Sequence, residues 1–344
     1  MTLCILFGGA SWEHEISIVS AITLKNVLKQ ENLLFIFLDE EHRFYHIQSH
    51  QMQADFFAQK KHKSQKPLHL DRRGFFTSGF FGKNPLEFDI LLNLVHGADG
   101  EDGTLAGLLD FYHIPYIGPR VEASVLSFNK LYTKIFAKER GIPTLPFVHL
   151  TQHQEQKIPL DFPLIIKPAR LGSSIGISIA KDPQSLNFAL DQAFEYDSSV
   201  LVEPFFSGIK EYNLAGCKIQ GDFVFSLIEE PGKKEFLDFE DKYLDFSRDS
   251  KIENANLSAQ NVTKMQKHFE ALYENCFEGA LIRCDFFIHE DKIYINEINP
   301  IPGSMANYLF EDFEKTLISL CTSLPKKKPI FVDYQYIKKI QKAK

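Results

Sequence analysis

Cysteines and long apolar runs are scarce in this sequence, and each absence argues against a class of protein. The five cysteines among 344 residues are scattered and include no C-x-x-C pair, so neither a disulfide framework nor a cysteine-held metal is expected. No apolar run approaches the ~20 residues of a membrane span, and the N-terminal run is short and lacks the basic flank of a signal peptide. We therefore expect a cytoplasmic protein with no membrane insertion.

Excess positive charge is also absent. The net charge of −7 argues against a general nucleic-acid binder. Residues 72–82, RRGFFTSGFFG, combine basic and aromatic side chains. Paired phenylalanines in a hairpin, however, pack more often on their own sheet than on bases. The seven lysines between 326 and 344 are interpreted as a solvated tail without a role. Nucleic acid is therefore not predicted as a partner.

The first part of the chain has the pattern of a parallel α/β sheet, in a protein long enough for two or three domains. We predict strands at 3–7, 33–38 and 89–95 and helices at 16–29 and 104–111. Residues 42–84 show no clean period and are interpreted as an insertion with a hairpin. The third strand ends in the loop 96–103, and ligands bind at such carboxyl ends.

Antiparallel strands are predicted for most of the remaining chain. The expected strands are 164–167, 200–206, 214–218 and 223–228, and the expected helices are 124–140 and 263–277. After the first of these strands, Gly172 and Gly176 bracket two serines in a flexible loop that can fold over phosphates. The loop is not a Walker loop, because no Gly-Lys-Ser/Thr follows. The long charged segment 229–256 is a candidate active-site loop.

Residues 282–288 and 293–298 alternate apolar and polar side chains on either side of a polar turn at 289–292, which predicts a β-hairpin. On the first strand, one face would carry Arg283, Asp285 and Phe287. On the second strand, one face would carry Ile293, Ile295, Glu297 and Asn299.

The pairing of this hairpin decides which polar groups meet. A three- or five-residue loop would bring Glu297 opposite Asp285, whereas a four-residue loop would bring Asn296 there. Asp285, Glu297 and Asn299 offer hard oxygen ligands that suit Mg²⁺ with bound phosphate. The alternative is a solvated acidic hairpin, but the second strand is otherwise apolar enough to be buried, where an unpaired charge is costly. A metal site is the favoured interpretation.

Four segments, in this order, resemble the D-alanine:D-alanine ligase family of the ATP-grasp superfamily. They are GGASWEHEIS (8–17), LVHGADGEDGTLAGLL (94–109), KPARLGSSIGIS (167–178) and RCDFFI with NEINPIPG (283–288 and 296–303). The resemblance covers nearly the whole chain and implies an α/β ATP-grasp fold with an N-terminal Rossmann-like domain. The expected domains are a substrate domain at 1–121, a central subdomain with the glycine-rich loop at 122–199, and a C-terminal subdomain with the metal site at 200–344.

The resemblance also implies an activity. Members of the family transfer the γ-phosphate of ATP to the carboxylate of one D-alanine, and a second D-alanine then attacks the acylphosphate through its amine. The implied cofactors are ATP and Mg²⁺, as two ions for which Mn²⁺ can substitute. The product would serve peptidoglycan synthesis, and the family alone implies a homodimer.

The resemblance assigns roles around the nucleotide. The metal ligands would be Asp285, Glu297 and Asn299, and the phosphate-binding groups Lys130, Lys167, Ser173 and Ser174. Adenine would meet Glu203, Phe205 and Phe206, and the ribose would meet Glu211. From the residues alone, Lys130 reads equally well as a solvated helix lysine and the two phenylalanines as core.

Roles around the amino acids follow in the same way. The oxyanion would be stabilised by Arg283 and the amide of Gly303, although Arg283 can also be a structural partner of Asp285. The first D-alanine would be held by Glu13, Ser173, Tyr243, Lys242 and His96. Glu13 alternatively favours a helix N-terminus through the helix dipole.

One position departs from the family pattern. The serine that usually binds the second carboxylate is replaced at Tyr308, so the tyrosine hydroxyl or the backbone of Tyr308 and Leu309 must take over that role. Two other functions fit these residues less well. A D-alanine:D-lactate ligase, or one for another D-amino or hydroxy acid, is less favoured because Tyr243 is neutral. A non-catalytic ATP-binding module is less favoured because the metal ligands are present.

Overall fold

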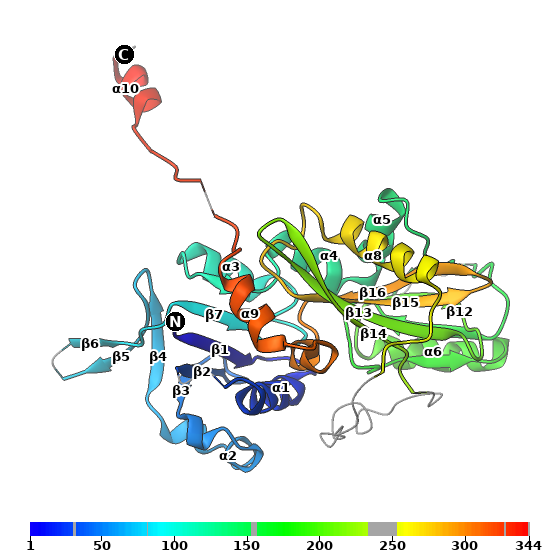
Figure 1. Cartoon of the computed structure of the whole chain (residues 1–344), viewed down its shortest axis with the longest axis horizontal. Coiled ribbons are helices and arrows are strands. Elements are labelled where there is room, and N and C mark those ends of the chain that lie inside the picture. The colour runs from blue at the N-terminus through cyan, green and yellow to red at the C-terminus, as the bar shows by residue number, and fades with distance from the viewer. Residues whose placement is uncertain (30–31, 81, 153–156, 233–252, 327, 343–344) are drawn as a thin grey trace.

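The computed structural model describes residues 1–29, 32–80, 82–152, 157–232, 253–326 and 328–342 (Figure 1). It contains one eight-stranded sheet and two four-stranded sheets. In the described chain no helix combines the length and the apolar character that crossing a bilayer requires. The predicted loop residues Lys242 and Tyr243 lie outside the described residues.

The eight-stranded sheet has the order β6-β5-β4-β3-β2-β1-β7-β8. Its parallel part consists of β1 (Leu3–Gly8), β2 (Leu33–Leu38), β7 (Ile90–Asn93) and β8 (Tyr116–Ile117). Every residue of β1 is buried, as expected for a strand covered on both faces. Helices α1 (His14–Val27) and α3 (Thr104–Phe111) follow strand ends. The predicted parallel sheet is confirmed, with element ends shifted by a few residues.

The insertion at 42–84 extends this sheet. Four antiparallel strands continue it at one edge: β3 (Phe44–Ile47), β4 (Pro67–Asp71), β5 (Gly74–Gly79) and β6 (Gly82–Pro85). The short helices η1 (Ser49–Gln51), α2 (Ala54–Ala58) and η2 (Lys61–Ser64) lie between β3 and β4. Phe75 is buried and packs against Phe44 within the same sheet. Phe75 therefore packs on its own sheet, as interpreted, whereas Phe80 of the same stretch is exposed.

The single helix predicted for 124–140 is wrong, because the chain forms two helices there. They are α4 (Val121–Phe128) and α5 (Lys130–Glu139), and the break falls at Asn129. Asn129 has extended backbone angles, and its side chain accepts a hydrogen bond from the amide of Leu131 at 3.0 Å, the contact of a helix N-cap. Lys130 therefore begins a helix.

A four-stranded antiparallel sheet forms the central part, with the order β11-β10-β12-β9. Its strands are β9 (Val148–Thr151), β10 (Leu164–Pro168), β11 (Ser178–Ala180) and β12 (Ser199–Pro204), and α6 (Pro183–Phe194) packs on it. Buried side chains such as Leu164, Ile166 and Val202 give this part a core of its own. The glycine-rich loop connects β10 to β11, as predicted.

The second four-stranded sheet has the order β14-β13-β15-β16. Its strands are β13 (Lys210–Ile219), β14 (Asp222–Glu229), β15 (Ile282–His289) and β16 (Lys292–Asn299). The helices that follow β14 and β16 are α8 (Ala259–Tyr273), η3 (Gly303–Leu309), α9 (Phe313–Cys321) and α10 (Gln335–Lys342). Figure 1 shows α10 projecting away from the rest of the molecule.

The N-terminal sheet and the last part of the chain share one hydrophobic core. Met305, Leu309 and Leu317, from η3 and α9, belong to the same buried cluster as Phe7 of β1 and Leu24 of α1. Helix α8 packs instead on a separate cluster with β13, β15 and β16. The boundaries at 121 and 199 stay a prediction.

Candidate active site

The β15–β16 hairpin has a two-residue loop and a β-bulge. His289 pairs with Lys292, so the loop is Glu290-Asp291, and both residues have positive φ as in a tight hairpin turn. The register shifts by one residue between Phe286 and Asp285, so that Phe286 pairs with Ile295 but Asp285 pairs with Glu297. Of the two pairings that the sequence left open, the structure has Asp285 opposite Glu297, and the bulge produces this pairing, not the loop length.

The bulge also changes which side chains share a face. Ile293, Ile295 and Ile298 all belong to the core under α8, so the predicted common face for Ile293, Ile295, Glu297 and Asn299 is wrong. The extra residue, Asn296, reverses the alternation of faces. The side-chain oxygen of Asn296 accepts a hydrogen bond from Nζ of Lys167 at 3.1 Å. Asn296 therefore faces the predicted phosphate lysine.

Asp285 is buried at 1% exposure and is held by two side chains. Arg283 donates to its two oxygens, from Nε at 2.7 Å and from Nη2 at 2.8 Å, and the amide nitrogen of Asn299 donates at 2.9 Å. Burial raises the pKa of Asp285, and Glu297 raises it further, while Arg283 opposes the shift. The net direction is upward, so an additional cation beside these carboxylates would be favourable.

The donor set fits a divalent metal. Asp285 and Glu297 sit opposite each other, and Asn299 lies opposite Arg283 in the same ladder. Two carboxylates and an amide oxygen are the hard ligands that Mg²⁺ and Mn²⁺ accept. Lys130 reaches the same place, since its Nζ lies 3.7 Å from Glu297 Oε2 and donates to the carbonyl oxygen of Leu171 in the glycine-rich loop. Lys130 is therefore not a solvated helix lysine.

Lys167 is the penultimate residue of β10, and its side chain points into a buried ion cluster. Its Nζ lies 2.9 Å from Glu203 Oε2 on β12, and the other carboxylate oxygen lies 2.6 Å from Nζ of Lys134 on α5. Glu203, predicted at the adenine, thus directs its side chain to two lysines. The amide of Phe205 donates to the carbonyl of Pro163, and Phe206 stacks on His289 at 4.2 Å between ring centroids.

Glu13 occupies the N-cap position of α1 but its side chain makes no capping hydrogen bond. Instead, the hydroxyl of Ser173 donates to Glu13 Oε1, which joins the first strand-helix turn to the glycine-rich loop as predicted. The other oxygen, Oε2, is buried without a hydrogen-bond partner among the described residues. Burial raises the pKa of Glu13, and Glu101 adds to the shift. This unpartnered oxygen is suited to a cationic group.

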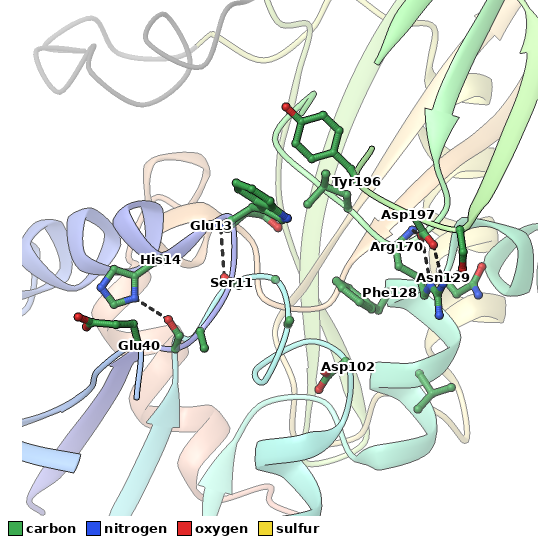
Figure 2. Close-up of a pocket in the computed structure, with 18 of the residues that line it drawn as sticks. Ser11, Glu13, His14, Glu40, Asp102, Phe128, Asn129, Arg170, Tyr196 and Asp197 are labelled. Carbon is green, nitrogen blue, oxygen red and sulfur yellow. Dashed lines mark hydrogen bonds and ion pairs between the residues drawn. The ribbon is translucent and has the colours of Figure 1, made fainter. Parts of the chain in front are cut away.

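Space around Glu13 depends on two glycines. A Cβ atom at Gly172 would lie 2.8 Å from Glu13 Oε1, and one at Gly97 would lie 2.9 Å from Oε2. Ser173 and Ser174 have left-handed backbone angles, with φ of 57° and 59°, which non-glycine residues rarely adopt outside functional loops. Glu13 also borders a cavity of ≈ 910 Å³ whose lining includes Arg170 and Asp197 but none of residues 282–299 (Figure 2).

His96 follows β7 and is buried at 3% exposure. Its Nε2 lies 3.0 Å from the hydroxyl of Ser20, which also accepts a hydrogen bond from the amide of Ser304 at 3.0 Å. Burial lowers the pKa of His96 to about 4, so its ring is neutral at pH 7. Nearby Glu101, 3.7 Å from Nδ1, has its pKa raised by burial to about 8. Through the hydroxyl of Ser20, His96 is linked to Ser304, the residue that follows Gly303.

The segment after Gly303 forms a left-handed turn. Ser304, Met305 and Ala306 have φ between 46° and 55°, although none is glycine. Met305 and Ala306 are buried, which compensates for a conformation that costs roughly 1–2 kcal/mol per residue. Tyr308 follows at 37% exposure, with its hydroxyl 3.4 Å from Glu229 Oε2. Leu309, by contrast, is fully buried.

The structure thus brings together most of the predicted site residues, while Glu211 lies one strand away, on β13 opposite Phe287. Three buried or partly buried residues of this region were not predicted from the sequence: Ser20, Glu101 and Lys134. Lys134 alone had a local signal, because it follows Lys130 by four residues on one helix. The others depend on contacts between distant segments.

The fold and the site are those of an ATP-grasp enzyme. Two antiparallel sheets bring the glycine-rich loop, Lys130 and Lys167 next to the β15–β16 hairpin, which carries the predicted metal ligands. The chain matches two family models, described as D-ala D-ala ligase N-terminus at residues 2–119 and D-ala D-ala ligase C-terminus at residues 136–315. The chain belongs to the D-alanine–D-alanine ligase family.

Individual relatives agree with this assignment. A D-alanine–D-alanine ligase of Wolinella succinogenes is 56% identical over 344 residues, covering 100% of this chain and 99% of that protein. The enzyme of Helicobacter pylori strain HPAG1 is 55% identical over 348 residues, covering 100% of both. A crystal structure of the ligase from Helicobacter pylori superposes with a TM-score of 0.86 at 50% identity, covering 95% of this chain and 100% of that one. The family depends on ATP and a divalent metal.

Proposed function

We propose that this protein joins two D-alanine molecules to form D-alanyl-D-alanine for peptidoglycan precursors, with ATP converted to ADP and phosphate. The contact that carries the proposal is the Glu13–Ser173 hydrogen bond, which sets a buried carboxylate between the N-terminal sheet and the glycine-rich loop. It provides an ammonium site within reach of a phosphate-binding segment. The full-length relatives support the same reaction.

In the first step, a carboxylate oxygen of the first D-alanine attacks the γ-phosphorus and ADP leaves. Glu13 binds the ammonium group of that D-alanine through its unpartnered oxygen, and neutral His96 lies close without adding charge. Lys130 and Lys167 bind phosphate oxygens, and the amides near Ser173 and Ser174 close over them. Asp285, Glu297 and Asn299 would hold two Mg²⁺ ions, which would supply positive charge to screen the repulsion between the two anions.

In the second step, the amine nitrogen of the other D-alanine attacks the carbonyl carbon of D-alanyl phosphate, loses a proton, and expels phosphate. The tetrahedral oxyanion forms beside Arg283, which Asp285 orients through two hydrogen bonds, and beside the amide of Gly303. Phe206 and Glu211 are assigned to the adenosine, whereas the carboxylate of Glu203 is occupied by Lys134 and Lys167. A homodimer and a cytoplasmic location stay predictions.

The test is incubation of the purified protein with Mg-ATP and D-alanine, D-lactate, D-serine or L-alanine, singly and in pairs. ADP release would be measured, and the products would be identified by mass spectrometry. D-alanyl-D-alanine formed from D-alanine alone is the expected result. ADP release only when D-lactate or D-serine accompanies D-alanine would support an ester- or mixed-dipeptide-forming ligase, and ATP binding without turnover would contradict the enzyme assignment.

Tyr308 offers a test of the second amino-acid site. Tyr308→Phe should raise the higher of the two KM values for D-alanine about fivefold. The reason is that the carboxylate of the second D-alanine loses one hydrogen bond, worth ~1 kcal/mol. The value of kcat should change less than twofold. Steady-state kinetics over a wide D-alanine range separates the two KM values. Tyr336→Phe, on α10, is the matched control, and an unchanged KM in Tyr308→Phe would leave the backbone as the carboxylate ligand.

A further inference from the structure

Glu203 lies between two lysines in the interior of the protein. Its Oε1 is 2.6 Å from Nζ of Lys134, and its Oε2 is 2.9 Å from Nζ of Lys167. The exposed fractions are 1% for Glu203, 2% for Lys134 and 6% for Lys167. The three groups come from β12, α5 and β10, so the cluster ties a helix to the sheet beside the glycine-rich loop.

The cluster carries a net positive charge. Burial by itself raises the pKa of Glu203, but Lys167 and Lys134 outweigh burial and bring the pKa down to about 2. The carboxylate is therefore ionised at pH 7. Burial lowers the pKa of Lys134, and the nearby carboxylate of Glu203 opposes that shift. With both lysines protonated, one negative charge faces two ammonium groups. Such an excess of buried cation is unfavourable alone and becomes favourable when an anion binds nearby.

Lys167 retains capacity for a further ligand. An ammonium group has three N–H donors. Within the described residues, Lys167 donates to Glu203 Oε2 at 2.9 Å and to Asn296 Oδ1 at 3.1 Å. Lys134, in contrast, makes a close ion pair with Glu203 but no well-aligned hydrogen bond, and its Nζ lies 5.5 Å from the ring centroid of Phe147. The two lysines are therefore not equivalent.

We propose that Lys134 is a positioning residue for ATP: it neutralises Glu203 so that Lys167 keeps its charge and one N–H donor for a phosphate group. The inference rests on the proposed role of Lys167 as a phosphate lysine. Each carboxylate oxygen has its own ammonium partner, and the partner of Oε1 comes from the helix that also begins with Lys130. Without Lys134, Lys167 alone balances Glu203, and the cluster loses its positive charge.

The test compares Lys134→Met, Lys134→Arg and the double variant Lys134→Met/Glu203→Gln in the full-length protein. Calorimetry without D-alanine gives the Kd for Mg-ATP, and ADP release gives the KM values. Lys134→Met should raise the Kd for Mg-ATP at least tenfold while changing the D-alanine KM values less than twofold. Lys134→Arg should stay within about threefold of the unmodified protein, and the double variant should bind Mg-ATP more tightly than Lys134→Met.

Lys138→Met is the matched control, because Lys138 is exposed and lies one turn further along α5. If Lys134→Met does not fold, the double variant, which removes one charge of each sign, still decides: its Kd should lie within about threefold of the unmodified protein. An unchanged Kd in Lys134→Met, or a double variant that binds no more tightly than the single one, overturns the proposal. Failure of the ligase assignment would appear separately, as no dipeptide from any variant despite measurable ATP binding.

Discussion

Arg283→Met should lower kcat by two to three orders of magnitude and the free energy of unfolding by about 3–5 kcal/mol. Arg283 donates two of the three hydrogen bonds that Asp285 accepts from described side chains, and Asp285 is buried at 1% exposure. Its removal leaves a carboxylate without its counter-ion and, in the proposed mechanism, an oxyanion without its cation. Urea denaturation and ADP release measure the two effects.

Arg283→Lys separates these roles. Lysine keeps the charge but cannot match both carboxylate oxygens with a planar pair of donors. We expect most of the stability to return while kcat remains at least tenfold low. Equal recovery of both quantities would mean that the charge alone matters, and near-normal turnover in Arg283→Met would remove Arg283 from the proposed oxyanion site.

Glu13→Gln should have opposite effects on activity and stability. The kcat/KM for the first D-alanine should fall by about two to three orders of magnitude, because a charge-assisted contact to the ammonium group is lost. The free energy of unfolding should rise by about 1 kcal/mol, because a buried carboxylate with one unpartnered oxygen is replaced by a neutral amide. Steady-state kinetics at pH 7 tests the predicted fall in kcat/KM, and urea denaturation at pH 7 tests the predicted rise in the free energy of unfolding.

The pH dependence gives a further check on Glu13. Burial raises its pKa above the ordinary value near 4.5, so the folded protein binds a proton more tightly than the unfolded chain. The contribution of Glu13 to the free energy of unfolding is therefore largest at low pH, and it decreases as the pH rises through the raised pKa of the folded state. The decline should be weaker in Glu13→Gln. Glu15→Gln, at an exposed position two residues later, should match the unmodified protein in both assays.

The hairpin shows how far the sequence alone could be interpreted. The alternation of residues 282–298 predicts two strands, and the residue types of Asp285, Glu297 and Asn299 predict their chemistry. The loop length is ambiguous, because Glu290 and Asp291 adopt positive φ without the Asn-Gly signal of a two-residue turn. The bulge at Asn296 is equally hidden, since it depends on isoleucines packing under α8.

Other errors and omissions have similarly local or long-range causes. The sequence around Asn129 has the pattern of a continuous helix, and only the structure shows that the side chain of Asn129 caps α5. Glu203 and Lys134 are 69 residues apart, and no local sequence pattern predicts an ion pair between a helix and an inner strand of a sheet. Ser20 contacts both His96, 76 residues away in the sequence, and Ser304, 284 residues away. Motifs identify which residues react, whereas the residues that orient them emerge only from packing.

The shared core has a consequence for how the molecule comes apart. Because Met305, Leu309 and Leu317 pack in one cluster with Phe7 and Leu24, the two ends of the sequence must lose their structure together. The central sheet keeps its own smaller core and can open without them. We therefore expect unfolding to reveal one discontinuous cooperative unit, built from the N-terminal sheet and the segment 305–317, with a separately melting lobe inserted between them.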